Sequence, residues 1–326
     1  MAFKDVLGHS RPITLLQRAI TNEKVANSYL FLGSEGIGKK YVALQFAKTL
    51  NCLEGDGGEA CDHCISCKKI DHALHPDVLL IEPEGQNIKV DQVRQLQKEL
   101  AYRPYEAKRR VCILTAADRM APHIPNTLLK TLEEPPLHTV IILLANNPRF
   151  ILPTILSRCQ PVRFNPLPIP LVSKWLMEDK GFNQAEAHLL ALLSEGSPGK
   201  ALEIQEEIRQ ISRQDLLKEW AGLKSLSLER IGSWVESLPS QRESLLLMLE
   251  VAKTLLRDLI MVKALKKGAK LIHSDLRQVM ESMAMNWSLP SLLKRMEILQ
   301  QTTLAIKANA NTSLALEAMM LSWAEG

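Results

Sequence analysis

Residues 31–42 read FLGSEGIGKKYV and place three glycines and a lysine in the order of a phosphate-binding loop. Gly33, Gly36 and Gly38 leave room for backbone N–H groups to converge on phosphate oxygens, and the ammonium of Lys39 can reach the terminal phosphates. An apolar run precedes the loop and a helical pattern follows it. The spacing therefore predicts a phosphate loop, with an ordinary glycine turn as the alternative.

The side chains that hold magnesium beside such a loop are missing. A Ser or Thr hydroxyl should follow the loop lysine, but Lys40 stands there. An acidic residue should end a neighbouring strand to hold the metal and polarise water. The candidate strand, VCIL (111–114), is followed by Thr115 and Ala116, and the first acid is Asp118. We therefore expect a degenerate site without hydrolysis, and the sequence leaves nucleotide binding open.

Four cysteines have the spacing of a metal site, C-x8-C-x2-C-x2-C. Cysteines three residues apart can turn back onto one ion, and four thiolates complete the tetrahedral coordination of zinc. Because no coordination position stays open, such an ion is structural and not catalytic. The sequence predicts one structural Zn²⁺ in an insertion over residues 52–67, with the ligands Cys52, Cys61, Cys64 and Cys67.

Hydrophobic periodicity predicts an α/β domain followed by helical domains. Short apolar runs alternate with helical patterns over residues 1–165, which indicates a largely parallel sheet. Strands are expected within 28–32, 75–83, 109–117 and 138–147, and helices over 40–50 and 90–100. A proline-rich stretch at 164–171 then marks a linker. The helical patterns beyond it predict a small lid domain over 166–207 and a C-terminal domain over 208–326 that acts as an oligomerisation collar.

Composition bounds the class of protein. The 326 residues carry a net charge of +4, and 46% of them are hydrophobic. We find no apolar run long enough for a membrane span and no signal-peptide core, so we expect a cytoplasmic protein with reduced thiols. The charge permits a nucleic-acid partner without requiring one. Basic residues near one expected strand could touch phosphates or form a solvated face: Arg103, Lys108, Arg109 and Arg110.

Taken together, these features resemble the delta-prime family of clamp-loader subunits of bacterial DNA polymerase III, which are relatives of the AAA+ ATPases. The resemblance covers essentially the whole chain. It is most specific in NTLLKTLEEPP (126–136) and TILSRCQPVRF (154–164), and it continues in GSPGKAL (196–202) and NANTSLALEAMML (309–321). It implies a P-loop AAA+ domain, a helical lid and a helical collar.

The resemblance also implies functional residues. Arg158, within Ser-Arg-Cys, matches the family's arginine finger, which reaches the γ-phosphate bound by a neighbouring motor subunit. On these three residues alone, an arginine paired with a carboxylate at a strand end remains the alternative. Active relatives carry an arginine at the position of Gly199, so this departure also removes nucleotide chemistry. Asn146 follows an apolar strand run and could act as a polar sensor or cap the strand.

The implied partners are motor subunits of the tau/gamma type and a delta subunit, with the sliding clamp and primed DNA reached through the complex. The chain is then a subunit of a DNA-directed DNA polymerase holoenzyme without ATPase activity of its own. Two other functions remain open at this point: an active AAA+ motor subunit of the same loader, and a zinc-dependent nucleic-acid-binding protein. The low aromatic content, 5%, gives little support to base stacking.

Overall fold

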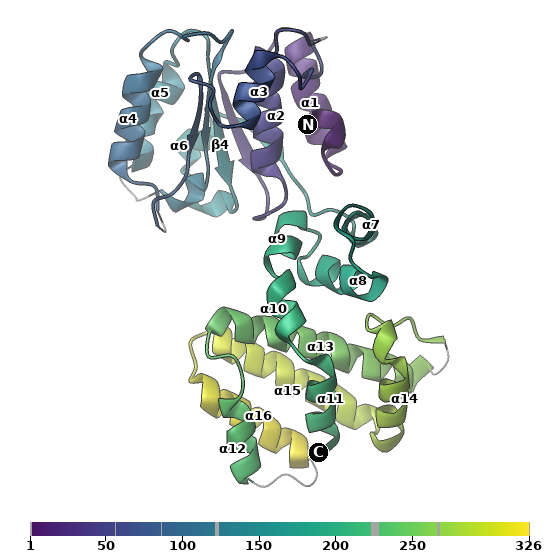
Figure 1. Ribbon diagram of the computed structural model, residues 1–326. Coiled ribbons are helices and arrows are strands. Elements are labelled where there is room, and N and C mark those ends of the chain that lie inside the picture. The colour runs from purple at the N-terminus through teal and green to yellow at the C-terminus, as the bar shows by residue number, and fades with distance from the viewer. Residues whose placement is uncertain are drawn as a thin grey trace. The chain divides into compact units, whose positions relative to one another are not determined.

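The computed structural model describes residues 2–55, 57–85, 87–120, 124–222, 228–265 and 268–325. The chain forms two compact units (Figure 1). Unit 1 comprises Met1–Leu171 and Glu195–Lys200, and unit 2 comprises Val172–Ser194 and Ala201–Gly326.

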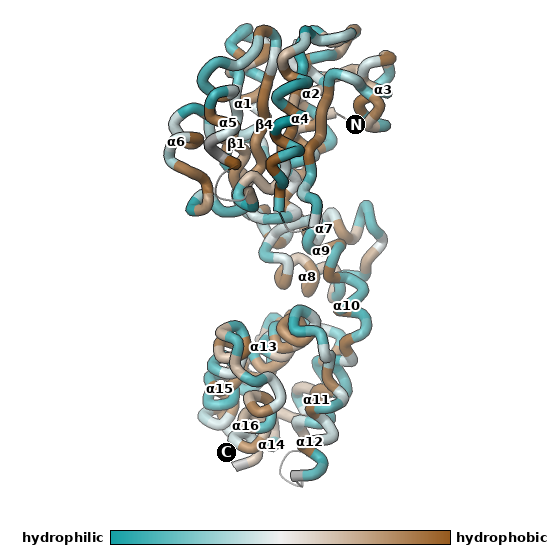
Figure 2. Tube along the Cα trace, turned by 90° about the vertical axis from the view of Figure 1, so that its left-hand side faces the viewer, coloured by the Kyte–Doolittle hydropathy of each residue, from teal (hydrophilic) through white to brown (hydrophobic). Residues whose placement is uncertain are grey.

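Unit 1 is built on a five-stranded sheet in the order β2-β3-β4-β1-β5, in which every paired strand is parallel. The strands are β1 (Ser28–Leu32), β2 (Val78–Ile81), β3 (Arg110–Leu114), β4 (Thr139–Ala145) and β5 (Gln160–Arg163). The central strands are almost wholly apolar, as the brown tubes of β1 and β4 show (Figure 2). Strands buried on both faces need such continuous apolar runs, so the predicted parallel α/β domain is confirmed.

Helices cover both faces of the sheet, with α1, α2 and α3 on one side and α4 and α5 on the other (Figure 1). Val93, Leu96 and Leu100 of α4 pack in one core cluster with Leu30 and Leu143 of the strands. The helical elements of this part are η1 (Phe3–Asp5), α1 (Ser10–Thr21), α2 (Lys39–Asn51), α3 (Ile65–Asp71), α4 (Val90–Leu100), η2 (Ala117–Arg119), α5 (Ile124–Glu133), η3 (Pro148–Phe150) and α6 (Pro153–Leu156).

The four strands expected from the sequence are present, but β5 was not predicted. Only Val162 of this strand is buried, so it lacks the apolar run that marks the others. Pro161 also weakens the pattern, since its nitrogen cannot donate a hydrogen bond. It is tolerated because β5 is an edge strand that pairs with β1 alone.

The chain beyond β5 is helical in the described residues. Its elements are α7 (Ile169–Lys180), α8 (Gln184–Leu193), α9 (Pro198–Glu203), α10 (Gln205–Gln210), α11 (Arg213–Gly222), α12 (Leu228–Glu236), α13 (Arg242–Leu265), η6 (Ser274–Leu276), α14 (Arg277–Asn286), α15 (Leu289–Lys307) and α16 (Thr312–Glu325). In unit 2, α13 packs against α14 and α15. A buried edge-to-face pair, Trp220 and Trp323, joins α11 to α16 with ring centroids 5.3 Å apart.

Candidate functional site

The predicted phosphate loop connects β1 to α2 at the carboxyl end of the parallel sheet. Gly36 and Gly38 have φ values of 69° and 106°, in the left-handed region that favours glycine. Gly33 is required for a different reason: a Cβ there would lie 2.5 Å from the carbonyl oxygen of Phe164. A strand, a glycine loop and a helix therefore follow one another as a phosphate loop requires.

Lys39 is buried and turned back onto its own loop. Its Nζ donates to the carbonyl oxygens of Gly33 (2.5 Å) and Ser34 (2.7 Å) and to Oδ1 of Asn146 (2.8 Å). Burial lowers the pKa of Lys39 to about 8, although the nearby carboxylate of Asp118 opposes the shift. The three bonds account for all three donors of an ammonium group.

The positions that should bind magnesium are used for other contacts. The ammonium of Lys40 pairs with Oε1 of Glu82 at 2.8 Å, just beyond the end of β2. Thr115, which follows β3, directs its hydroxyl to the carbonyl oxygen of Ile81 at 3.2 Å. Ala116 has no polar side chain. The residues that replace the metal-binding groups therefore supply an ion pair and a hydrogen bond within the protein.

Asp118 holds the turn that presents Asn146, a role the sequence did not reveal. Its Oδ2 accepts hydrogen bonds from the backbone nitrogens of Asn146 (3.1 Å) and Asn147 (3.0 Å). Asn146 in turn accepts from Lys39. Of the two roles considered for Asn146, a polar group directed into the loop describes the geometry better than a strand cap.

The segment Glu195–Lys200 packs directly on the glycine loop. The backbone nitrogen of Gly199 donates to the carbonyl oxygen of Gly36 at 2.8 Å, and the hydroxyl of Ser197 donates to the carbonyl oxygen of Glu35 at 2.7 Å. A Cβ on Gly199 would lie 2.7 Å from the Gly36 oxygen. Gly199, where active relatives were expected to carry arginine, thus lies in close contact with the backbone of the glycine loop at Gly36.

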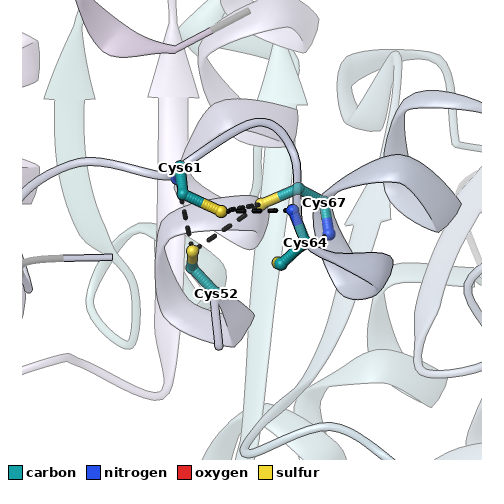
Figure 3. Close-up of side chains that lie close together, drawn as sticks. All are labelled: Cys52, Cys61, Cys64 and Cys67. Carbon is teal, nitrogen blue, oxygen red and sulfur yellow. Dashed lines mark hydrogen bonds between the residues drawn. The ribbon is translucent and has the colours of Figure 1, made fainter. Parts of the chain in front are cut away.

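The four predicted metal ligands lie together, with all their sulfur atoms within 4.8 Å of one another (Figure 3). The Sγ atom of Cys67 lies 3.7 Å from that of Cys52 and 4.0 Å from that of Cys61. Tetrahedral zinc with bonds of about 2.3 Å places sulfurs about 3.8 Å apart. None of these cysteines forms a disulfide. The cluster therefore fits a metal ion of this kind.

Backbone N–H groups point at the sulfur atoms, which offsets in part the burial that raises the pKa of Cys61 and Cys67. The nitrogen of Cys61 lies 3.3 Å from Sγ of Cys52, and that of Cys64 lies 3.3 Å from Sγ of Cys61. Burial raises the pKa of Cys64, but hydrogen bonds from the nitrogens of Leu53 and Cys67 outweigh it and lower the pKa to about 6. His63 pairs instead with Glu54, at 2.6 Å.

The cysteine-bearing insertion is fastened to the helices beneath it. The side chain of Lys48 in α2 is fully buried and pairs with Asp62 and, at 2.9 Å, with Asp71. Elsewhere in the insertion, the carboxylate of Glu59 accepts hydrogen bonds from the side chain of Gln17 in α1 at 2.9 Å and from the backbone nitrogen of Phe3 at 3.0 Å. The insertion is therefore part of unit 1 and not a separate appendage.

Arg158 lies just beyond α6 and is partly exposed, with 35% of its side chain accessible. Its Nη2 pairs with Oε1 of Glu133 at 2.6 Å, and its Nη1 donates to the carbonyl oxygen of Thr154 (3.0 Å) and the hydroxyl of Ser157 (3.2 Å). The alternative anticipated from the sequence, an arginine paired with a carboxylate, thus describes its contacts within this chain. Cys159 beside it is buried, which raises the pKa of its thiol to about 12.

Arg110 does not belong to a solvated basic face. It is buried, and its Nη2 and Nε donate to Oδ1 of Asp77 at 2.7 and 3.1 Å. Asp77 also accepts from the backbone nitrogens of residues 105–107. The possible phosphate contact of Arg110 is therefore ruled out by its burial, since a partner cannot reach it; Arg103 and Arg109 stay exposed or half-exposed.

The parallel sheet, the loop after β1 and the helices on both faces define a P-loop α/β domain, followed by helical regions. The sequence profile of the family "DNA polymerase III, delta subunit" matches residues 8–168. None of the helices in the described part of the chain combines the length and the apolar character that a membrane span needs.

Full-length relatives give the particular family. The chain is 33% identical to DNA polymerase III subunit delta′ of Pseudomonas aeruginosa over 308 residues, 92% of each chain. It is 29% identical to DNA polymerase III subunit delta′ of Bacillus subtilis over 323 residues, 97% of this chain and 96% of that one. The chain belongs to the delta-prime family of DNA polymerase III subunits.

Among solved structures, a gamma subunit-related protein from Thermotoga maritima has a TM-score of 0.45 at 20% identity, covering 96% of this chain and 99% of that chain.

Proposed function

We propose that this chain is a non-hydrolysing delta-prime subunit of a clamp loader, which helps place a sliding clamp on primed DNA. Membership of the delta-prime family supports the clamp-loader role. Its partners are motor subunits of the tau/gamma type and a delta subunit, and the clamp and DNA are reached through that complex. Unit 1 carries the chemistry, and the helices over 208–326 form the collar that joins the subunits, with 166–207 as the lid.

The observation that carries the absence of hydrolysis is the Lys40–Glu82 ion pair. Lys40 stands where a magnesium-binding hydroxyl is required and its ammonium is engaged by Glu82, and neither Thr115 nor Ala116, directly after β3, supplies a carboxylate. Attack on a γ-phosphate needs a metal to bridge phosphate oxygens and a residue that orients water. The loop of Gly33, Gly36, Gly38 and Lys39 therefore keeps its structural role after losing the metal chemistry.

Arg158 acts in trans on a neighbouring motor subunit. In that reaction the oxygen of water bonds to the γ-phosphorus and the bond to the bridging oxygen breaks. The bridging oxygen keeps the electron pair, and the products are ADP, inorganic phosphate and a proton. A guanidinium beside the equatorial oxygens stabilises the charge that develops there, and such fingers contribute about 10³- to 10⁵-fold in rate. Phe150 and Leu156, which precede Arg158 in the chain, are exposed apolar residues of the kind that a subunit interface would cover.

The four cysteines hold one structural Zn²⁺. Cys52, Cys61, Cys64 and Cys67 supply four thiolates, and a bound zinc ion would link the end of α2 to the start of α3. Zinc supplies cross-linking only, because all four coordination positions are filled by protein. The chain's own groups fasten the insertion to α1 through Glu59 and to α2 through Asp62.

The test is the ATPase activity of the reconstituted loader with clamp and primed DNA. Arg158→Ala should join the complex and lower the stimulated rate, in part only, because the other nucleotide sites do not border this chain. Arg158→Lys should not restore the rate, since an ammonium cannot reproduce a planar group with several donors. Wild-type activity in an assembled Arg158→Ala complex would refute the trans-acting role. Turnover by the pure chain, lost in Lys39→Ala, would favour an active motor subunit instead.

A further inference from the structure

Two segments that are distant in the sequence meet at Arg158. The stretch NTLLKTLEEPP (126–136) forms most of α5 and the turn after it, and TILSRC (154–159) forms α6 and its end. Glu133 is the last residue of α5, and its carboxylate lies 2.6 Å from Nη2 of Arg158. The proposed function uses the second stretch and gives no role to the first.

The contacts of Arg158 fix one end of the guanidinium and leave donors available. Nη1 donates to Thr154 and Ser157, and Nη2 lies 2.6 Å from Oε1 of Glu133 in an ion pair. A guanidinium has five N–H donors in a rigid plane. Its Nε and Nη2 hydrogens form no hydrogen bond among the described residues, so these donors remain for a phosphate while the two Nη1 bonds and the ion pair hold the plane.

We propose that Glu133 is the positioning residue of Arg158: its carboxylate holds the guanidinium in the orientation in which it meets the nucleotide of the neighbouring subunit. This inference rests on the proposed trans-acting role of Arg158. Without Glu133, the long side chain would keep only its two Nη1 bonds and would sample other rotamers. A guanidinium that is already oriented loses less freedom when the transition state forms.

The pair has little to contribute to folding. The side chains of Arg158 and Glu133 are 35% and 48% exposed, and ion pairs between exposed groups add little to stability. The effect of Glu133 is therefore expected on the rate of the neighbouring site. Glu134 is a matched control, because it is also exposed and its side chain forms no recorded hydrogen bond or ion pair among the described residues.

The experiment compares Glu133→Ala, Glu133→Gln, Glu134→Ala, Arg158→Ala and the double variant Glu133→Ala/Arg158→Ala in the reconstituted loader with clamp and primed DNA. Assembly is checked by size-exclusion chromatography. We expect Glu133→Ala to lower kcat about two- to fivefold, the range of an exposed ion pair, with KM for ATP and the unfolding midpoint of the chain unchanged. Glu133→Gln, which keeps an acceptor oxygen, should lie between Glu133→Ala and wild type.

The double variant separates positioning from other roles. If Glu133 acts through Arg158, its removal has no further effect once Arg158 is alanine, so the double variant should match Arg158→Ala. Additive losses, a Glu133→Ala chain that no longer assembles, or a loss equal to that of Glu134→Ala would overturn the proposal. An Arg158→Ala loader with wild-type activity would instead reject the trans-acting role of Arg158 on which this inference rests. A slow Arg158→Ala loader beside a normal Glu133→Ala loader would reject the positioning role alone.

Discussion

Removal of the Asp77 carboxylate should destabilise unit 1 strongly. Asp77 is fully buried and accepts hydrogen bonds from three backbone nitrogens and from Arg110. Breaking a buried ion pair from one side costs about 3 to 5 kcal/mol, because the remaining charge is left without compensation. We therefore expect Asp77→Ala to lower the free energy of unfolding of unit 1 by about that amount. The exposed Asp91 provides a control, since Asp91→Ala should change this free energy by less than about 1 kcal/mol.

The same carboxylate predicts a dependence on pH. Burial raises the pKa of Asp77, but bonds from the nitrogens of Glu106 and Tyr105, and from the guanidinium of Arg110, outweigh it and lower the pKa to about 2. The folded state thus favours the charged form. The stabilisation is fully present above the ordinary pKa of 3.8 and is lost as the pH falls toward 2. The difference between the ordinary pKa of 3.8 and the folded-state pKa of about 2 corresponds to about 2 to 3 kcal/mol of stability.

The distribution of aromatic residues makes this measurable unit by unit. All four tyrosines lie in unit 1, at positions 29, 41, 102 and 105, and all five tryptophans lie in unit 2. Urea unfolding followed by the circular dichroism of tyrosine should show the lower free energy of unfolding of unit 1 in Asp77→Ala. The unfolding transition of unit 2, followed by tryptophan fluorescence, should not shift. A tyrosine transition within about 1 kcal/mol of wild type would refute the argument that Asp77 compensates a buried charge.

Four further outcomes are expected. Freshly purified, reduced protein should contain one equivalent of zinc by elemental analysis, and Cys64→Ala or acidification should release it, because thiolates are the ligands. Lys40→Thr should leave the pure chain without ATP turnover, since Thr115 and Ala116 still provide no carboxylate. Gly199→Ala should lower the stability of unit 1 by about 1 to 3 kcal/mol in urea unfolding, because its Cβ would meet the Gly36 oxygen at 2.7 Å. A chain that ends at residue 207 should fail to assemble with its partners in size-exclusion chromatography, since it lacks the proposed collar.

The sequence predicted the features that depend on local patterns. The apolar runs gave β1 and β4, and the helical period of Val93, Leu96 and Leu100 gave α4. The cysteine spacing also predicted a cluster that the fold brings together. These features depend on residues close to one another in the chain, so their patterns are visible without the fold.

Features that depend on distant contacts could not be predicted. The edge strand β5 has one buried residue and a proline, so it resembles a loop until β1 is known to lie beside it. The ion pair between Glu133 and Arg158 joins the end of α5 to a residue just beyond α6 and 25 positions later, and neither local pattern indicates the other residue. Arg110 looked like part of a basic surface because its buried partner, Asp77, belongs to a neighbouring strand region.

The position of β1 in the sheet has a consequence for the order in which unit 1 folds during synthesis. Ser28 of β1 pairs with Ile141 of β4, and Tyr29 pairs with Gln160 of β5. Neither edge of β1 can therefore pair with its neighbouring strand until more than a hundred further residues have left the ribosome. Such distant pairings form slowly. The cysteine cluster closes within residues 52–67, so a bound metal can order the end of α2 long before the sheet is complete.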